Sequence, residues 1–262
     1  MNVKTTNSAL DRIVEACDEV EKREEALIMG TVIRAIGSNP QHVGARILIF
    51  QNGDIRGTVG GGKVEAEVIN DAQKMLEEGK DFHISKYNLL QIGMTCGGAM
   101  EIFLERIDIS PQLILFGGGH VAAPTADFAT KVGFNVTVVD ERTDWANKER
   151  FPSSTIINQP FSEFLETFIP QKHHYLLLLS SGHKHDQEIL EKIIAGPQRY
   201  TGMIGSRRKA KTMHDELKKK GFSEEQWEQI HCPVGIPLGE NHPSEIAISI
   251  VAELIQVRYQ TS

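Results

Sequence analysis

The first hundred residues alternate between helical and strand-like patterns of apolar side chains. From residue 8 to residue 26, apolar residues recur every three to four positions, which predicts an amphipathic helix with Cys17 on its buried face. Three strand-like runs follow, and Asn52-Gly53 between the last two indicates a type I′ hairpin turn. These runs are Leu27–Ile36, Ala45–Phe50 and Ile55–Val59.

The pattern then continues with a glycine triplet, a helix and two further strands. Gly60-Gly61-Gly62 precedes a helical stretch at Lys63–Glu78, which Gly79 ends. The expected strands are Ile84–Ile92 and Met100–Arg106. Because strands outnumber helices in this part, we expect a small α+β domain at residues 1–109.

After Pro111 the pattern changes to short apolar runs that alternate with helical segments. The clearest strands are Leu113–Phe116, Asn135–Val139, Tyr175–Leu179 and Gly202–Ile204. The helices are Ala122–Lys131, Phe161–Phe168, Asp186–Ile194, Arg207–Lys220 and a last one that begins at Pro243. Such alternation predicts a parallel sheet covered on both faces. The expected fold class is therefore α/β, with a Rossmann-type domain at residues 110–262 beside the smaller N-terminal α+β domain.

Composition narrows the class of protein. The formal net charge of −7 disfavours nucleic acid and membrane surfaces as partners, because both are polyanionic. The three cysteines lie far apart without a Cys-x-x-Cys pair, which disfavours a disulfide framework or a zinc ribbon. We therefore expect a cytoplasmic protein, and a homodimer because that is the commonest symmetric assembly.

The sharpest motif is a glycine turn between the first strand and the first helix of the C-terminal domain. Gly117, Gly118, Gly119 and His120 form this turn, and Asp140 ends the next strand. In a Rossmann fold such glycines let backbone N–H groups approach a phosphate, and the acid accepts from a ribose hydroxyl. We interpret these five residues as a phosphate- or nucleotide-binding site; a tight turn that binds nothing is the alternative.

A second loop is expected at the same edge of the sheet, because the carboxyl ends of parallel strands meet there. Gly205 and Ser206 precede Arg207 and Arg208 at the start of a helix. Ser206 is a favourable N-cap, and cations at a helix N-terminus oppose the helix dipole unless an anion lies nearby. The loop is thus a candidate site for phosphate or carboxylate, with solvated arginines as the alternative.

Cys96 is the candidate reactive group. It lies in a glycine-rich turn at residues 93–98, where little side-chain bulk would bury it, and an accessible thiol can act as nucleophile or ligand. His183 and His185 lack an obvious third ligand, so we interpret them as polar residues that line a cleft and predict no metal site.

Seven segments together resemble the xanthine dehydrogenase accessory family (XdhC/CoxI-like proteins), in the family's order and over nearly the whole chain. They are Gly57–Glu65, Gly93–Glu101, Phe116–Ala122, Gly133–Arg142, Ser181–Asp186, Gly202–Arg208 and His231–Gly239. The resemblance implies a chaperone rather than a catalyst, which binds molybdenum cofactor (molybdopterin), protects its sulfurated form and delivers it to a xanthine-dehydrogenase-type molybdoenzyme. A cysteine desulfurase is a further candidate partner. In one departure, Lys63 stands where the family usually carries cysteine; a lysine there is suited to hold a phosphate.

Under this interpretation Cys96 is a soft ligand for the metal-dithiolene end of the cofactor, and the phosphate lies over the two loops of the Rossmann domain. Two other classes stay open. One is an NAD(P)-dependent oxidoreductase that uses the same glycine turn, although no tyrosine is followed by a lysine four residues later. The other is a nucleotide-sensing module without chemistry.

Overall fold

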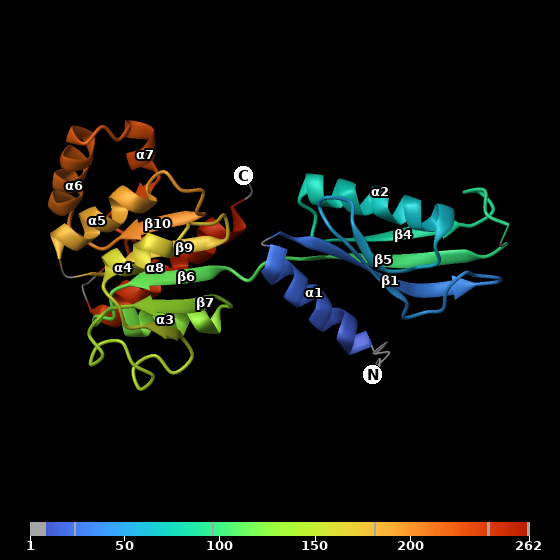
Figure 1. Cartoon of the computed structure of the whole chain (residues 1–262), viewed down its shortest axis with the longest axis horizontal. Coiled ribbons are helices and arrows are strands. Elements are labelled where there is room, and N and C mark those ends of the chain that lie inside the picture. The colour runs from blue at the N-terminus through green and yellow to red at the C-terminus, as the bar shows by residue number, and fades with distance from the viewer. Residues whose placement is uncertain (1–8, 24, 96, 181, 240–241, 261–262) are drawn as a thin grey trace. The chain divides into compact units, whose positions relative to one another are not determined.

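A computed structural model describes residues 9–23, 25–95, 97–180, 182–239 and 242–260 of the chain. The chain divides into two compact units, Met1–Ile109 and Ser110–Ser262, each built around its own sheet (Figure 1). One sheet is antiparallel and the other is parallel, so the predicted α/β class with an N-terminal α+β domain is confirmed. Within the described residues, no helix is both long and apolar enough to cross a membrane.

The N-terminal unit is a five-stranded antiparallel sheet in the order β3-β2-β1-β5-β4. Its elements are α1 (Ala9–Arg23), β1 (Leu27–Ile36), β2 (Arg46–Ile49), β3 (Ile55–Gly57), α2 (Gly62–Glu78), β4 (Phe82–Asn88) and β5 (Ala99–Ile107). Helix α2 buries Val64, Val68 and Ala72 against the sheet, because residues three to four apart share one helix face. Gly79 ends this helix in the left-handed conformation, as glycine does most easily.

Helix α1 presents a different face to the sheet from the one predicted. Ala16 and Val20 are buried, whereas Cys17 is exposed, so the expected burial of Cys17 is wrong. The same buried face carries Glu19, which accepts a hydrogen bond from Arg56 at 2.9 Å. The buried face of the helix therefore includes a carboxylate that is paired with strand β3, which hydrophobic spacing alone could not reveal.

Two local predictions in this unit need correction. The Asn52-Gly53 hairpin has a three-residue loop rather than the two-residue type I′ turn, because Phe50 N donates to Asp54 O and Gly53 N donates to Phe50 O. The strand expected to end at Ile92 ends at Asn88, and the chain turns there with Ile92 N donating to Asn88 O.

The C-terminal unit is a six-stranded parallel sheet in the order β11-β10-β9-β6-β7-β8. Its strands are β6 (Gln112–Phe116), β7 (Asn135–Val139), β8 (Thr155–Ile157), β9 (His174–Leu178), β10 (Tyr200–Met203) and β11 (Ile230–His231). Its helices are α3 (Ala122–Lys131), α4 (Phe161–Thr167), α5 (His183–Ile193), α6 (Arg207–Lys219), α7 (Glu224–Glu228) and α8 (Pro243–Tyr259). Numbered along the chain, the strand order is that of a doubly wound Rossmann fold.

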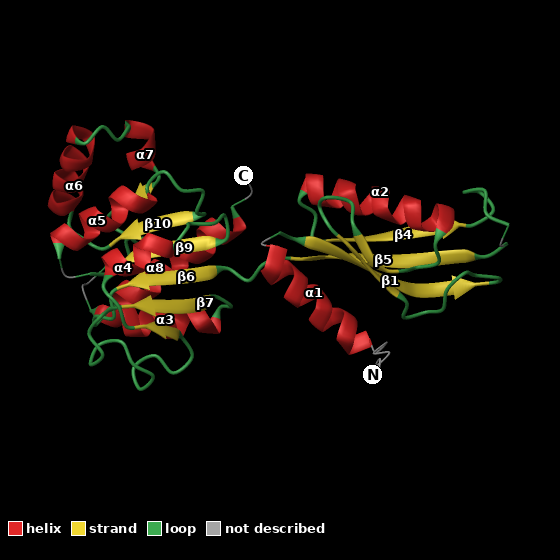
Figure 2. Ribbon diagram, viewed as in Figure 1, coloured by secondary structure: helices red, strands yellow, loops and turns green. Residues whose placement is uncertain are grey.

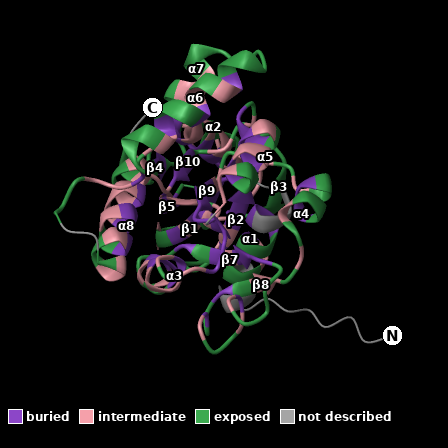
Figure 3. Ribbon diagram, turned by 90° about the vertical axis from the view of Figure 1, so that its left-hand side faces the viewer, coloured by how far each residue is buried: buried purple, intermediate pink, exposed green. Residues whose placement is uncertain are grey.

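Helices cover both faces of this parallel sheet (Figure 2). Helices α3 and α8 pack on one face around Leu113 and Leu115, and α4, α5 and α6 pack on the other around Ile114 and Phe116. The strands are consequently buried while the outer faces of the helices are exposed (Figure 3). Such double cover explains why the strands are continuous apolar runs in the sequence.

Candidate functional site

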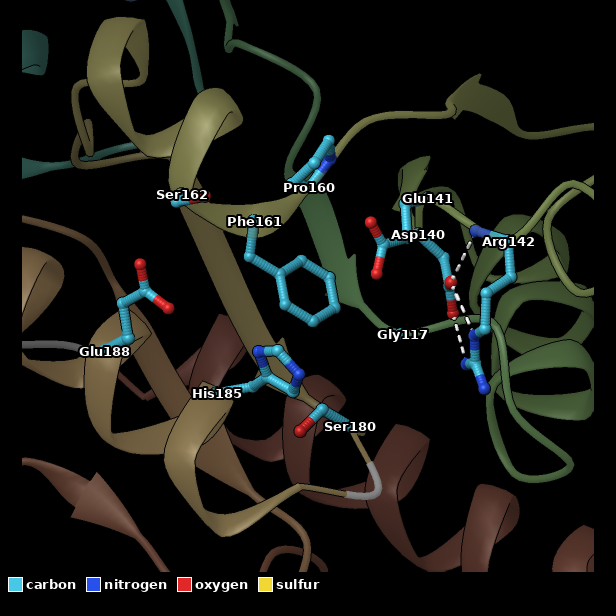
Figure 4. Close-up of a pocket in the computed structure, with 10 residues that line it drawn as sticks. All are labelled: Gly117, Asp140, Glu141, Arg142, Pro160, Phe161, Ser162, Ser180, His185 and Glu188. Atoms are coloured by element: carbon cyan, nitrogen blue, oxygen red, sulfur yellow. Dashed lines mark hydrogen bonds and ion pairs between the residues drawn. The ribbon is translucent and has the colours of Figure 1, made fainter.

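A cavity of about 180 Å³ lies at the carboxyl ends of β6, β7 and β9 (Figure 4). Gly117 follows β6, Asp140 follows β7 and Ser180 closely follows β9, and all three line the cavity. The sheet order reverses between β6 and β9, so this is the topological switch point at which ligands bind in open α/β sheets. We call it the switch-point cavity.

The three glycines of the loop after β6 differ in how much space the surrounding structure leaves for a side chain. Gly117 has a φ of 115°, and a Cβ atom there would lie 3.0 Å from the Leu179 backbone. A Cβ atom on Gly118 would lie 2.7 Å from Trp145 O. On Gly119, by contrast, it would meet nothing closer than 3.9 Å. The fold therefore requires the first two glycines for packing, whereas Gly119 leaves space beside the start of α3.

Arg150 holds the backbone of this glycine loop, Gly117–His120, through hydrogen bonds to its carbonyl oxygens. Arg150 donates from Nη1 to Gly118 O at 2.7 Å and from Nη2 to Gly119 O at 3.3 Å. The Arg150 guanidinium also lies 4.8 Å from the centre of the Trp145 ring. Helix α3 begins without a side-chain cap, so N–H groups of its first turn are left for an anion.

Asp140 organises the loop with both of its oxygens. Its Oδ2 accepts from Gly118 N at 2.8 Å, and the Arg142 side chain donates to both oxygens at 2.9 and 2.6 Å. Oδ1 also accepts from Arg142 N at 3.0 Å. Burial alone would raise the pKa of Asp140, but the hydrogen bonds from Arg142 and Gly118 outweigh it and lower that pKa. The carboxylate expected to accept from a ribose hydroxyl is thus already occupied by four donors of its own chain.

The second predicted loop follows β10 at the same edge of the sheet, with β9 between the two loops. Ser206 is the N-cap of α6 and accepts from Lys209 N at 3.2 Å, so its predicted capping role is confirmed. A Cβ atom on Gly205 would lie 2.7 Å from Lys209 Cδ, so a side chain there would require the Lys209 side chain to shift. Arg207 and Arg208 are exposed, and within the described part of the chain neither guanidinium group makes a hydrogen bond or ion pair.

A buried polar network connects the loops after β9 and β10. Asp186, which is fully buried, forms an ion pair with Lys209 and accepts from Ser180 Oγ at 2.7 Å. Lys209 also donates to Ile204 O at 3.1 Å. The network links Ser180 at the cavity to the start of α6 through the buried Asp186 carboxylate.

Histidines and cysteines are distributed over both units. His185 lines the switch-point cavity, and His183 Nε2 lies 2.8 Å from Glu216 Oε2. Across the described residues, no group of three metal-ligating side chains is present. Cys96 lies outside the described residues. Burial raises the pKa of the Cys232 thiol to about 11, which leaves it protonated at neutral pH.

In the N-terminal unit, the glycine triplet and the glycine-rich turn lie together. A Cβ atom on Gly93 would lie 2.5 Å from Lys63 Nζ, so the Lys63 side chain covers the beginning of the turn that contains Cys96. Glu65 Oε2 accepts from Thr58 Oγ1 at 2.7 Å and from Gly61 N at 3.2 Å, which holds the triplet in place. Two motifs separated by about thirty residues in the sequence thus form one end of this unit.

Sequence reasoning missed several residues of the site. Phe161, at the start of α4, and Arg150 reach it only through tertiary structure. Arg142 and Glu141 could have been noticed, because they directly follow the acid that ends the second strand.

The fold and the site define the class: a Rossmann-fold protein with a glycine loop at its switch point and a separate α+β unit. Family models agree with both units, since the "XdhC Rossmann domain" matches residues 113–254 and the "XdhC and CoxI family" model matches residues 20–88. The chain belongs to the XdhC and CoxI family.

Three curated proteins are similar to this chain. The "uncharacterized protein YqeB" of Escherichia coli is 34% identical over 92% of the chain, and a probable xanthine dehydrogenase component of Bacillus subtilis is 32% identical over 60%. These alignments cover 45% and 46% of the relatives, so the chain spans about half their length. The "molybdenum cofactor insertion chaperone PaoD" of Escherichia coli is 22% identical over 89% of the chain and 86% of its own length.

One solved structure has the same fold over nearly its whole length. A xanthine dehydrogenase from Bacillus halodurans matches with a TM-score of 0.55 and 22% identity, over 95% of this chain and 96% of that one. This likeness concerns the fold alone.

Proposed function

We propose that this protein binds molybdenum cofactor and delivers it to a xanthine-dehydrogenase-type molybdoenzyme. The names of PaoD and of the Bacillus subtilis relative support this role, as does membership of the XdhC and CoxI family. The observation that carries the proposal is Gly119, whose missing side chain leaves space next to an uncapped helix start although the fold itself has room for a Cβ atom.

The described residues fit a phosphorylated cofactor. The phosphate would be held by N–H groups at Gly119, His120 and the first turn of α3, where a helix dipole favours an anion. Arg207 and Arg208 have exposed guanidinium groups at the start of α6, on the same edge of the sheet, and would add charge-assisted hydrogen bonds to an anionic ligand. Asp140 would act indirectly, by fixing the loop through Gly118 N.

Cys96 is our candidate for the contact with the metal end of the cofactor. A thiolate is a soft ligand that suits molybdenum, and the bound cofactor would supply the metal-dithiolene and terminal sulfur chemistry of the client enzyme. Lys63 lies against the turn that contains Cys96, so its ammonium group would attract an anionic cofactor to this end of the unit. The same proposal includes protection of a sulfurated cofactor and a cysteine desulfurase as a further partner. It also includes a homodimeric assembly and a cytoplasmic location.

The experiment that tests this role compares Cys96→Ser with wild type in cells that make molybdenum cofactor and a client molybdoenzyme. We expect Cys96→Ser to lower both the molybdenum bound to the purified protein and the activity of the client, because serine keeps the size but removes the soft sulfur. Cys17→Ser and Cys232→Ser are matched controls, since Cys17 is exposed on a helix and Cys232 is a protonated thiol. Wild-type molybdenum content in all three variants would contradict thiol ligation.

A second candidate function follows from the strand order of the C-terminal unit. A doubly wound sheet with a glycine loop at its switch point is also the architecture of NAD(P)-dependent oxidoreductases and nucleotide sensors. A dinucleotide that binds in place of the pterin, with no retained molybdenum, would favour this candidate.

A further inference from the structure

The switch-point cavity is lined by a carboxylate to which the Rossmann motif assigns no role. Glu141 lines the cavity, and its carboxylate points toward the Phe161 ring in Figure 4. Within the part of the chain that the structure describes, it makes no hydrogen bond or ion pair. Asp140, the residue the motif assigns, accepts four hydrogen bonds from Gly118 and Arg142 and has no free lone pair directed at a ligand. The carboxylate that is available to accept a hydrogen bond from a ligand is therefore Glu141, one residue after Asp140.

The wall opposite this carboxylate is aromatic. Phe161 packs edge-on against the buried Phe116, with ring centres 5.9 Å apart, and it lines the cavity together with His185. The Phe161 and His185 rings are 5.6 Å apart and nearly perpendicular. An anchored aromatic face beside a polar rim suits a planar heterocycle, because such rings stack favourably on aromatic side chains.

The carboxylates of the cavity lining disfavour a phosphate in its interior. The Arg142 guanidinium is neutralised by Asp140, with which it forms an ion pair at 2.6 Å, and in Figure 4 it lies on the far side of that carboxylate from Phe161. Glu141 and Glu188 add two further carboxylates to the lining, and the Arg142 charge that acts on Glu141 is shared with Asp140. The phosphate of a ligand would lie outside, at the glycine loop, while the neutral end of the ligand, rich in N–H donors, enters the cavity.

We propose that the switch-point cavity binds an amino-substituted heterocyclic ring, with Glu141 rather than Asp140 as its carboxylate acceptor. A carboxylate has two oxygens that can accept from two adjacent N–H groups at once. Pterins and guanine carry an amino group next to a ring N–H and match this pattern, whereas adenine has no ring N–H beside its amino group. The inference rests on the proposed cofactor-binding role, and it selects the pterin end of the cofactor, or a guanine base attached to it, as the part that is buried.

The test is binding of four probes to the purified full-length chain by isothermal titration: neopterin monophosphate, GMP, AMP and inorganic phosphate. We expect neopterin monophosphate and GMP to bind about tenfold more tightly than AMP, because they gain a charge-assisted hydrogen bond. Glu141→Gln should remove this preference and leave phosphate binding unchanged. Glu163→Gln is the matched control, since Glu163 is an exposed residue of the neighbouring helix α4 that does not line the cavity.

The outcomes separate this inference from the proposed function. Preferred AMP binding, or an unchanged preference in Glu141→Gln, would overturn the assignment of Glu141 whether or not the chain carries molybdenum. If neither ring compound binds while the purified protein retains molybdenum, the cavity assignment falls and the delivery role stands. If GMP binds in a Glu141-dependent manner and no molybdenum is retained, the cavity assignment stands and the delivery role falls. Comparison of neopterin monophosphate with GMP identifies which of the two rings the cavity prefers.

Discussion

Three adjacent glycines in the loop after β6 illustrate how identical residues serve different purposes. Gly117 and Gly118 are glycine because neighbouring backbone leaves no space, whereas Gly119 has both space and a backbone conformation that other residues can adopt. Sequence reasoning correctly placed all three in a βα turn. It could not separate them, because the atoms that crowd Gly118 belong to Trp145 in a distant loop.

This difference predicts opposite effects for two matched substitutions. Gly118→Ala should destabilise the protein by about 2 kcal/mol, because its Cβ atom would overlap Trp145 O. Gly119→Val should leave the unfolding temperature nearly unchanged but abolish binding of a phosphorylated ligand, because its branched side chain would occupy the space beside α3. Thermal unfolding and ligand titration of both variants check this. Unchanged affinity in Gly119→Val would remove the phosphate site from the loop.

The lowered pKa of the single residue Asp140 predicts how the free energy of unfolding depends on pH. Its folded-state pKa is lowered, so its charged form stabilises the protein above the unfolded-state pKa of about 4, and this stabilisation is lost as the pH falls through the folded-state pKa. Asp140→Asn should therefore lower the free energy of unfolding at pH 7 by about 2 kcal/mol and make it less sensitive to acid below pH 4. Urea titrations at pH 7 and pH 3 measure both effects. An Asp140→Asn protein as stable as wild type at pH 7 would show that the four hydrogen bonds contribute little.

At the scale of elements, segments with a clear apolar pattern were predictable, whereas some of the shortest strands were not. Helix α3 and strand β7 have the bounds expected from the sequence, because each combines a clear hydrophobic pattern with a glycine boundary. Strands β8 and β11 are two or three residues long and carry no usable periodicity, so both were missed. Missing β8 also hid the reason why Phe161, at the start of the following helix, faces the site.

The ion pair between α5 and α6 gives a prediction at this scale. Asp186 is fully buried, and removal of its cationic partner would leave an uncompensated charge inside the protein. Lys209→Met should therefore destabilise the C-terminal unit by about 3 kcal/mol, and Asp186→Asn combined with Lys209→Met should recover part of this loss. Chemical unfolding of the single and double variants checks the coupling. Additive effects would mean that the two side chains do not support each other.

At the scale of the whole molecule, the sequence predicted two units of different fold and one chemical role for each unit. The change from antiparallel to parallel strands was visible in the spacing of apolar residues on either side of Pro111. The role of each unit was not visible in the same way. Cys96 and Lys63 belong to one unit and the glycine loop to the other, so the roles proposed for them can be tested by separate substitutions.

Native mass spectrometry of the full-length protein tests this central claim most directly. The protein would be purified without oxygen from cells that make molybdenum cofactor. We predict an added mass that contains molybdenum and a pterin, and its loss in Gly119→Val, because the phosphate can no longer approach α3. A bound NAD(P) without molybdenum, or a molybdenum-containing mass that Gly119→Val retains in full, would contradict the account.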